Sequence, residues 1–186
     1  MGPSGSGKDS LMRYARQVLR GTGNVIFAHR YITRPLDPDK GENYIALSTE
    51  EFAQRLQAGC FAMHWDSHGY HYGIGIEIDS WLALGLKVVL NGSRAYLEQA
   101  RSRYPELCPI AVQVTLRHLR ERLLARGRET GAQLEERLRQ VVELDEQVWH
   151  VPGLLILNND GTLEDAGERL VALLLQGENL QPGFSI

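Results

Sequence analysis

The sequence predicts an α/β protein in which a parallel sheet is flanked by helices. Four short apolar runs have the composition of buried parallel strands, and they span residues 25–28, 87–91, 110–116 and 154–159. Amphipathic stretches alternate with these runs, at residues 4–19, 94–103, 118–126, 133–150 and 164–175. Because strands and helices alternate, we expect ligands to bind at the carboxyl ends of the strands.

The first predicted helix follows a glycine-rich loop, MGPSGSGKDS, with the pattern G-x-x-x-x-G-K at Gly2, Gly7 and Lys8. Glycines let backbone N–H groups converge on phosphate oxygens, the helix presents its positive end, and Lys8 adds a mobile charge. The alternative is a plain glycine-rich turn before a helix. We interpret the loop as a P-loop for ATP and Mg²⁺. The predicted nucleotide-binding residues are Gly2, Pro3, Ser4, Gly5, Ser6, Gly7, Lys8, Asp9 and Ser10.

Asp9 stands where this pattern usually has serine or threonine. A carboxylate beside a triphosphate is repelled unless a cation lies between them, so we predict that Asp9 holds Mg²⁺, directly or through water. The alternative is an acidic residue of the first helical turn, favoured by the helix dipole. Only Met1 precedes the loop, whereas a P-loop needs a strand to fix its entry. We therefore expect a missing or truncated first strand, of which Met1 is the end.

The length of 186 residues predicts one domain, residues 1–186. Residues 29–75 interrupt the α/β rhythm and are rich in Tyr, His, Gly and Pro, with one short helix indicated by the capping-box spacing of Ser48 and Glu51. We interpret this segment as an acceptor-binding insert.

The formal net charge of -3 does not favour nucleic acid or an acidic membrane as a partner, and a small-molecule acceptor fits better. Two unpatterned cysteines, no apolar run of membrane-spanning length and no signal peptide predict a cytoplasmic protein. A monomer and a homodimer are both compatible with the sequence.

Along nearly the whole chain, short motifs resemble the landmarks of the guanylate kinase family, in order. They are GPSGSGK at 2–8, TRP at 33–35, GENY at 41–44, EEFAQRLQAGCF at 50–61, HW at 64–65, HGYHYG at 68–73, RERLLARGRET at 120–130 and LNNDGTLEDA at 157–166. The resemblance implies a P-loop kinase with a lid at about residues 117–147. It also implies that Arg126, Arg128 and Arg137 of the lid act with Lys8 on the transferred phosphoryl group. For each lid arginine the alternative is a solvated helix face.

The resemblance further implies that Arg34, Tyr44 and Tyr72 grip the acceptor's phosphate. For the tyrosines, the alternative is a core aromatic with a satisfied hydroxyl group. One arginine of the family's R-x-x-R pattern is Asp37 here.

The residues that read guanine in that family are replaced, by Arg30, His64, Asn91 and Ser93. Changing such hydrogen-bonding groups costs discrimination, so the pocket is not expected to read guanine. Arg30 and His64 instead join the predicted acceptor site, because positive and neutral donors suit a second phosphate and sugar hydroxyls.

With LNGSR at residues 90–94, this pattern resembles the ribose 1,5-bisphosphate phosphokinases, guanylate kinase relatives of phosphonate breakdown. These enzymes use ATP to make 5-phospho-α-D-ribose 1-diphosphate. Two alternatives stay open: a nucleoside monophosphate kinase for another base, and an inactive guanylate-kinase-like binding module.

Overall fold

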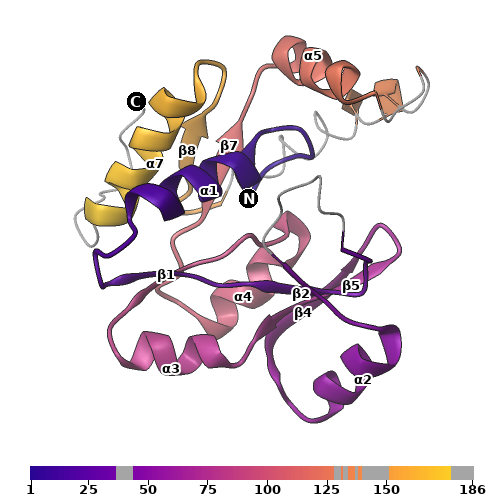
Figure 1. The fold of residues 1–186 in the computed structure, drawn as a ribbon, viewed down its shortest axis with the longest axis vertical. Coiled ribbons are helices and arrows are strands. Elements are labelled where there is room, and N and C mark those ends of the chain that lie inside the picture. Colours follow the sequence, from indigo (N-terminus) through magenta and orange to yellow (C-terminus); the bar gives the residue numbers. More distant parts are fainter. Residues whose placement is uncertain (37–43, 128–130, 132–133, 137, 140–150, 177–186) are drawn as a thin grey trace. The chain divides into compact units, whose positions relative to one another are not determined.

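The computed structural model describes residues 1–36, 44–127, 131, 134–136, 138–139 and 151–176. The chain divides into two compact units (Figure 1). The first unit joins Met1–Val18 to Arg101–Ile186, and the second is Leu19–Ala100. Since one unit holds both ends of the chain, the second unit is an insertion into the first.

Among its described residues, the first unit contains a parallel pair of strands and several helices. The elements are α1 (Lys8–Val18), β7 (Ile110–Gln113), α5 (Leu116–Arg126), β8 (Leu155–Asn158) and α7 (Leu163–Gln176). β7 and β8 run parallel, with Ile110 opposite Leu155. Met1 lies beside β7, because its amino group donates to the Ile110 carbonyl at 2.7 Å and its carbonyl accepts from the Val112 N–H at 2.8 Å. Met1 thus has the place in which the end of a first strand is expected.

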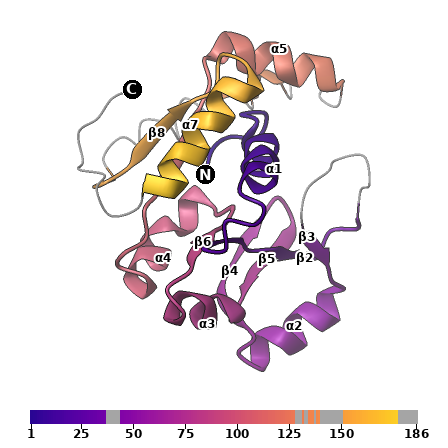
Figure 2. The ribbon, with the colours of Figure 1, turned by 60° about the vertical axis from the view of Figure 1, so that its left-hand side comes forward.

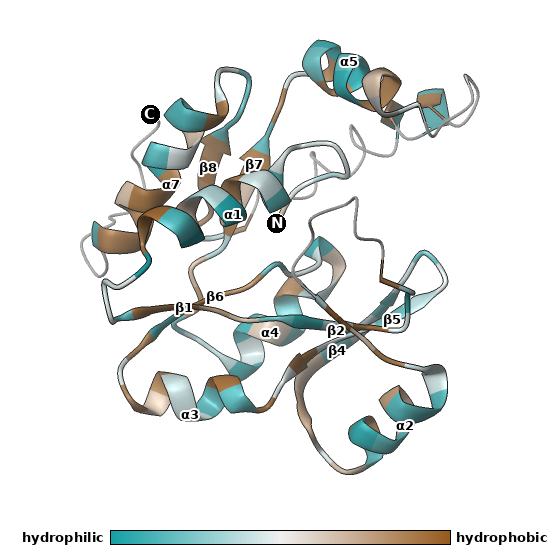
Figure 3. Ribbon diagram, viewed as in Figure 1, coloured by the Kyte–Doolittle hydropathy of each residue, from teal (hydrophilic) through white to brown (hydrophobic). Residues whose placement is uncertain are grey.

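A close approach between α1 and α7 closes the core of this unit. A Cβ atom on Gly167 would lie 2.4 Å from the Tyr14 ring, so only glycine permits this packing. Figure 3 shows β8 and much of α7 as apolar. The buried apolar residues here include Leu11, Ala15, Leu157, Leu170 and Val171.

The described residues of the second unit form two sheets. β1 (Val25–Phe27) and β6 (Lys87–Val89) form a parallel pair. A four-stranded sheet has the order β3-β2-β5-β4. Its strands are β2 (Arg30–Ile32), β3 (Tyr44–Ala46), β4 (Phe61–Ser67) and β5 (Tyr70–Gly75). Three helical elements accompany the sheets: α2 (Thr49–Gln57), α3 (Glu77–Ala83) and the short 3-10 helix η2 (Arg94–Tyr96). α4 (Leu97–Arg103) follows η2 and crosses the boundary between the units.

α2 covers one face of the four-stranded sheet (Figure 2). Phe52 of α2 stacks on Phe61 of β4, with ring centroids 4.6 Å apart. The predicted cap of this helix is confirmed, since the Ser48 side chain accepts from the Glu51 N–H at 3.1 Å.

Each of the four apolar runs contains a strand, so the α/β prediction is confirmed, but several boundaries differ for local reasons. The first helix begins at Lys8 rather than Ser4, because Gly5 and Gly7 have positive φ. The strand predicted at 110–116 ends at Gln113, because Thr115 caps α5. Most of the helix predicted at 133–150 lies outside the described residues. α3 and the four strands β2 to β5 were not among the predicted elements. Two of these strands, β2 and β3, have only three residues each, too few for a periodic pattern.

Candidate active site

The course of the P-loop depends on glycine at two positions. Gly5 and Gly7 have φ of 93° and 85°, the left-handed region that favours glycine. A Cβ atom on Gly5 would lie 2.8 Å from the Leu119 side chain of α5, and one on Gly7 would lie 2.4 Å from the Asn159 amide nitrogen. Both conformation and space therefore require glycine at position 7, the second glycine of the predicted pattern, and at position 5, which the pattern leaves open.

Lys8 begins α1 and folds back over the loop. Its ammonium group donates to the Pro3 carbonyl at 3.4 Å and lies 4.0 Å from the Asp9 carboxylate. Both side chains keep solvent access, with 20% and 33% of the Lys8 and Asp9 side chains exposed. The first N–H groups of a helix have no partner within the helix, so this end suits an anion.

These residues fit a nucleoside triphosphate with Mg²⁺. The loop's glycines have no side chains to cover its backbone N–H groups, Lys8 supplies a positive charge and Asp9 an accessible carboxylate. The described residues include no group of three or more His, Cys, Asp and Glu side chains that could hold a metal ion. Mg²⁺ does not need such a group, since it binds through one or two carboxylates together with substrate phosphates and water.

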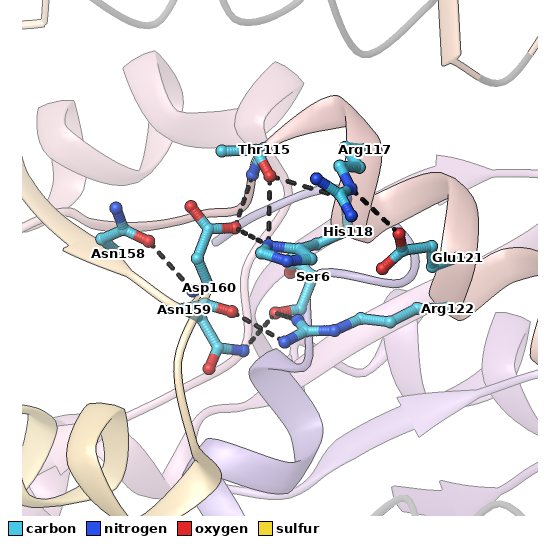
Figure 4. A network of polar contacts seen from close by, with 9 residues as sticks. All are labelled: Ser6, Thr115, Arg117, His118, Glu121, Arg122, Asn158, Asn159 and Asp160. Atoms are coloured by element: carbon cyan, nitrogen blue, oxygen red, sulfur yellow. Dashed lines mark hydrogen bonds and ion pairs between the residues drawn. The ribbon is translucent and has the colours of Figure 1, made fainter.

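A polar network supports the loop from the side of β8 and α5 (Figure 4). The Ser6 carbonyl accepts from the Asn159 side-chain amide at 2.6 Å and from Arg122 at 3.4 Å. Arg122 also donates to the Asn159 carbonyl at 2.8 Å. Neither Asn159 nor Arg122 was among the predicted site residues. Their signal in the sequence is the polar N-N-D run at the carboxyl end of a predicted strand, where ligand sites of α/β sheets gather.

Asp160 ties the same end of β8 to the start of α5. Its carboxylate accepts from the Thr115 N–H at 2.8 Å and lies 3.0 Å from His118 Nδ1. Partial burial acts to raise the pKa of Asp160, but the hydrogen bonds from His118 and Thr115 outweigh it, so the pKa is lowered.

Of the three predicted lid arginines, only one lies in the described part of the chain. Arg126 is the last residue of α5, and only its backbone is described. Arg128 and Arg137 lie outside the described residues, so the catalytic roles of all three arginines stay predictions. Within the predicted lid, Leu134 and Leu138 pack in one cluster with Leu119 and Leu123 of α5.

An open cleft of about 360 Å³ lies between α5 and the later lid residues Glu135, Leu138 and Arg139, and three arginines line it. Arg120 lies 2.7 Å from Glu135, while Arg117 and Arg139 pair with Glu121 and Glu136. Because each guanidinium group already has a carboxylate partner, the cleft is not a strong anion site.

In the second unit, strand register brings four side chains to one face of the four-stranded sheet. Arg30 is opposite Tyr44, and Ile32 is opposite Tyr72, which in turn is opposite Trp65. Directly opposite residues share a face, and so do alternate residues of a strand. The side chains of Arg30, Tyr44, Trp65 and Tyr72 therefore share this surface, here called the aromatic face.

Contacts among these side chains support the arrangement. The Trp65 and Tyr72 rings stack with centroids 5.6 Å apart and an interplanar angle of 7°. The Arg30 guanidinium carbon lies 6.0 Å from the Tyr72 centroid, and that of Arg34 lies 4.8 Å from the Tyr44 centroid. Four of the five predicted acceptor residues, Arg30, Arg34, Tyr44 and Tyr72, are thus gathered at this face.

The two tyrosines also belong to the core of the sheet. Tyr44 and Tyr72 are 7% and 8% exposed and pack around Ile32. The Tyr44 hydroxyl group donates to the Pro35 carbonyl at 2.6 Å. The core interpretation therefore describes their rings, while the half-buried guanidinium groups of Arg30 and Arg34 carry the positive charge.

His64 does not join the aromatic face. It is opposite Gly73 and adjacent to Trp65 in β4, so its side chain projects from the other side of the sheet. Phe61 lies on that side, because a Cβ atom on Gly73 would meet its ring at 2.7 Å. The structure therefore does not bring His64 and Arg30 to the same face of the sheet, and a role of His64 in acceptor binding stays a prediction.

Trp65 and Tyr96 are residues that the sequence analysis did not assign to the site. The Tyr96 ring of η2 lies 5.9 Å from that of Trp65 and extends the aromatic row. Their order in the sequence does not reveal the pair, since Tyr96 comes from a separate element.

The chain has relatives of similar length. It is 54% identical over 186 residues to ribose 1,5-bisphosphate phosphokinase PhnN of Thiobacillus denitrificans, covering 100% of this chain and 95% of the relative. The protein of the same name from Desulfomicrobium baculatum is 52% identical over 176 residues, 95% and 92% of the two chains. That from Chromobacterium violaceum is 47% identical over 180 residues, 97% and 94% of the two chains. No protein-family model matches the chain.

A solved structure supports the fold independently. Guanylate kinase from Anaplasma phagocytophilum matches with a TM-score of 0.70 at 16% identity, over 97% of this chain and 84% of that chain. The predicted guanylate-kinase-like fold is thereby confirmed. Within the described residues, no helix combines the length and apolar character that a membrane crossing requires.

Proposed function

Since the chain belongs to the ribose 1,5-bisphosphate phosphokinase family, we propose that it transfers the γ-phosphoryl group of ATP to ribose 1,5-bisphosphate. The product would be 5-phospho-α-D-ribose 1-diphosphate, made in phosphonate breakdown. A kinase needs a nucleotide co-substrate, and ATP with Mg²⁺ is our assignment of it. We place the reaction in the cytoplasm, which agrees with two free cysteines, Cys60 and Cys108.

The P-loop is the donor site of this proposal. The backbone of Gly5 to Lys8 binds the phosphates, the Lys8 ammonium group offsets negative charge on the transferred group, and Asp9 holds Mg²⁺. ATP supplies the activated phosphoryl group. An oxygen of the acceptor's 1-phosphate attacks the γ-phosphorus, the bond to the ADP oxygen breaks, and no bond to the protein forms. Arg126, Arg128 and Arg137 are assigned to the spreading negative charge.

The acceptor site of this proposal is the aromatic face with Arg34. The observation that carries the assignment is the position of Arg30, half-buried beside Tyr72 on the same face as Tyr44. An acceptor with two phosphates and no base needs two separate cationic groups, and a planar guanidinium matches a phosphate through paired hydrogen bonds. Arg30 and Arg34 provide two such groups.

An acceptor panel tests the function directly. The protein is incubated with ATP and Mg²⁺ together with ribose 1,5-bisphosphate, ribose 5-phosphate or GMP, and ADP release and the phosphorylated product are measured. We expect turnover of the bisphosphate and a GMP rate lower by about 10⁴-fold, as for a site whose groups do not match the ligand. Equal turnover of GMP would indicate a nucleoside monophosphate kinase, and no turnover of any acceptor would indicate an inactive binding module.

Two arginine variants separate the acceptor's phosphates. Arg30→Ser should weaken binding of the bisphosphate by about 1–3 kcal/mol, the range for a lost charge-assisted contact, with ATP affinity near normal. Arg34→Ala should weaken every phosphorylated acceptor alike. An unchanged bisphosphate affinity in Arg30→Ser would remove Arg30 from the site.

A further inference from the structure

We propose that Asn159 and Arg122 are positioning residues of the P-loop, which turn the Gly7 N–H group toward bound nucleotide phosphates. They act through the Ser6 carbonyl rather than on the reacting atoms. The inference rests on the proposed role of the loop as the nucleotide site.

The Ser6 carbonyl is anchored by two side chains. It accepts from the Asn159 side-chain nitrogen at 2.6 Å and from Arg122 at 3.4 Å (Figure 4). Asn159 is only 4% exposed, so the hydrogen bond from its side-chain amide to the loop is shielded from water. A buried bond of this kind is costly to leave unmade.

Asn159 is itself held in place by hydrogen bonds of its backbone. Its backbone N–H continues the β7–β8 ladder by donating to the Gln113 carbonyl at 2.8 Å, and its own carbonyl accepts from Arg122 at 2.8 Å. Arg122 thus contacts both Ser6 and Asn159. The anchor of the loop is therefore built on a strand end and a helix, which are more rigid than the loop.

The peptide group between Ser6 and Gly7 couples the direction of the Ser6 carbonyl to that of the Gly7 N–H. In a planar trans peptide the C=O and N–H groups point in opposite directions, and the described chain has no cis peptide bond. Anchoring the Ser6 carbonyl toward Asn159 consequently directs the Gly7 N–H away from it. Glycine rotates more freely than any other residue, so this peptide needs an external restraint to hold one orientation.

The space beside Gly7 is occupied by the Asn159 side chain. A Cβ atom there would lie 2.4 Å from the Asn159 amide nitrogen and 3.6 Å from Arg122. The Asn159 amide thus lies where a side chain of residue 7 would begin. Glycine at position 7 and asparagine at position 159 are parts of one arrangement.

The test changes the donor without changing its size. Asn159→Asp replaces the amide nitrogen by an oxygen, which cannot donate to the Ser6 carbonyl. Asn158→Asp is the matched control: it adds the same negative charge one residue earlier, at an exposed side chain whose oxygen accepts from the Asp160 N–H at 3.0 Å and still can do so as a carboxylate.

Binding of ATP and of inorganic tripolyphosphate to the full chain is measured by calorimetry, with thermal unfolding as a check of folding. Tripolyphosphate has neither base nor sugar, so it reports on the phosphate cradle alone. We expect Asn159→Asp to weaken both ligands about tenfold or more, as for a lost buried hydrogen bond. Asn158→Asp should stay within about twofold of the unmutated protein, as for a surface change.

Three outcomes would overturn the proposal. Unchanged affinities in a folded Asn159→Asp protein would show that the amide does not position the loop. Weaker ATP with unchanged tripolyphosphate would place Asn159 at the base or sugar instead. If Asn159→Asp does not fold, Arg122→Met makes the same comparison, and failure of both to fold would make the pair structural only. Separately, an unmutated protein that binds neither ligand would overturn the proposed nucleotide site itself.

Discussion

The P-loop and the aromatic face are suited to bind phosphate by different means. In the P-loop, the backbone of a contiguous stretch is fixed by Asn159 and Arg122 through the Ser6 carbonyl. At the aromatic face, charge is carried by the side chains of Arg30 in β2 and Arg34 just after it, and each lies against a tyrosine ring of another strand. The P-loop is in the first unit and the aromatic face is in the second.

This difference indicates how specificity and chemistry are divided. A site made of backbone N–H groups binds its ligand only in one conformation of the loop, so a substitution that changes this conformation weakens binding. A site made of side chains on a sheet can change its ligand by exchanging those side chains while the strands stay the same. We therefore expect variants of the loop to affect the donor and turnover, and variants of the aromatic face to affect the acceptor.

The largest expected effect is that of Lys8→Ala. Loss of a charge that stabilises the transferred phosphoryl group should lower kcat about 10²-fold or more, at every Mg²⁺ concentration. Acceptor affinity, measured separately by calorimetry, should stay near normal. Asp9→Ala is the companion variant and should instead raise the Mg²⁺ concentration for half-maximal rate. An unchanged Mg²⁺ curve would leave Asp9 as a first-turn acid.

Gly7→Ala should have the next largest effect. The left-handed φ of 85° alone costs about 1–2 kcal/mol for an L-residue, and the clash with Asn159 adds to this cost. Gly69→Ala is the control, because Gly69 has a similar φ of 77° with no heavy atom within 4 Å of its Cβ position. Unfolding in denaturant should show the larger loss for Gly7→Ala, together with weaker ATP binding. Equal losses of stability and normal ATP binding would contradict the close approach.

Trp65→Ala should have a smaller effect, confined to the acceptor. Its stacking on Tyr72, of a kind that contributes about 0.5–1.5 kcal/mol, orders the aromatic face before the acceptor binds. In the variant, acceptor binding must supply this ordering, so the KM for ribose 1,5-bisphosphate should rise about 2–10-fold. The KM for ATP should not change. Trp81→Ala, on α3 and outside the aromatic face, is the control for removing an indole ring. A rise in both KM values would mean that Trp65 supports the whole protein and not the acceptor site.

The smallest expected effect is a pH dependence at Asp160. Hydrogen bonds to its carboxylate lower the pKa in the folded state below the ordinary value of 3.8. The stabilisation is therefore fully present above that value and is lost as the pH falls through the lower, folded pKa. Thermal unfolding from neutral to acidic pH should show a steeper acid-side decline for the unmutated protein than for Asp160→Asn. Parallel pH profiles would contradict this role.

Sequence reasoning and structure agree best where the chemistry is local. The family resemblance and the kinase activity that it implied are confirmed by relatives at about half identity over nearly the whole chain. The roles of Lys8, Asp9 and the lid arginines stay predictions.

By itself, the sequence determined the P-loop, the α/β order and the cap of α2, because each depends on residues within a few positions of one another. A glycine pattern and a capping-box spacing carry their geometry with them. The residues that form each feature are neighbours in the chain, so no knowledge of distant contacts is needed to predict it.

Tertiary structure alone decided the rest of the site. Asn159 and Arg122 are 153 and 116 residues from Ser6, and only chain folding brings them to its carbonyl. The side of the sheet on which His64 lies depends on strand register, and the β4–β5 register shifts between Phe61 and Met63. Because side chains alternate between faces, a shift of one residue changes which of them share a surface, and local sequence does not record that shift.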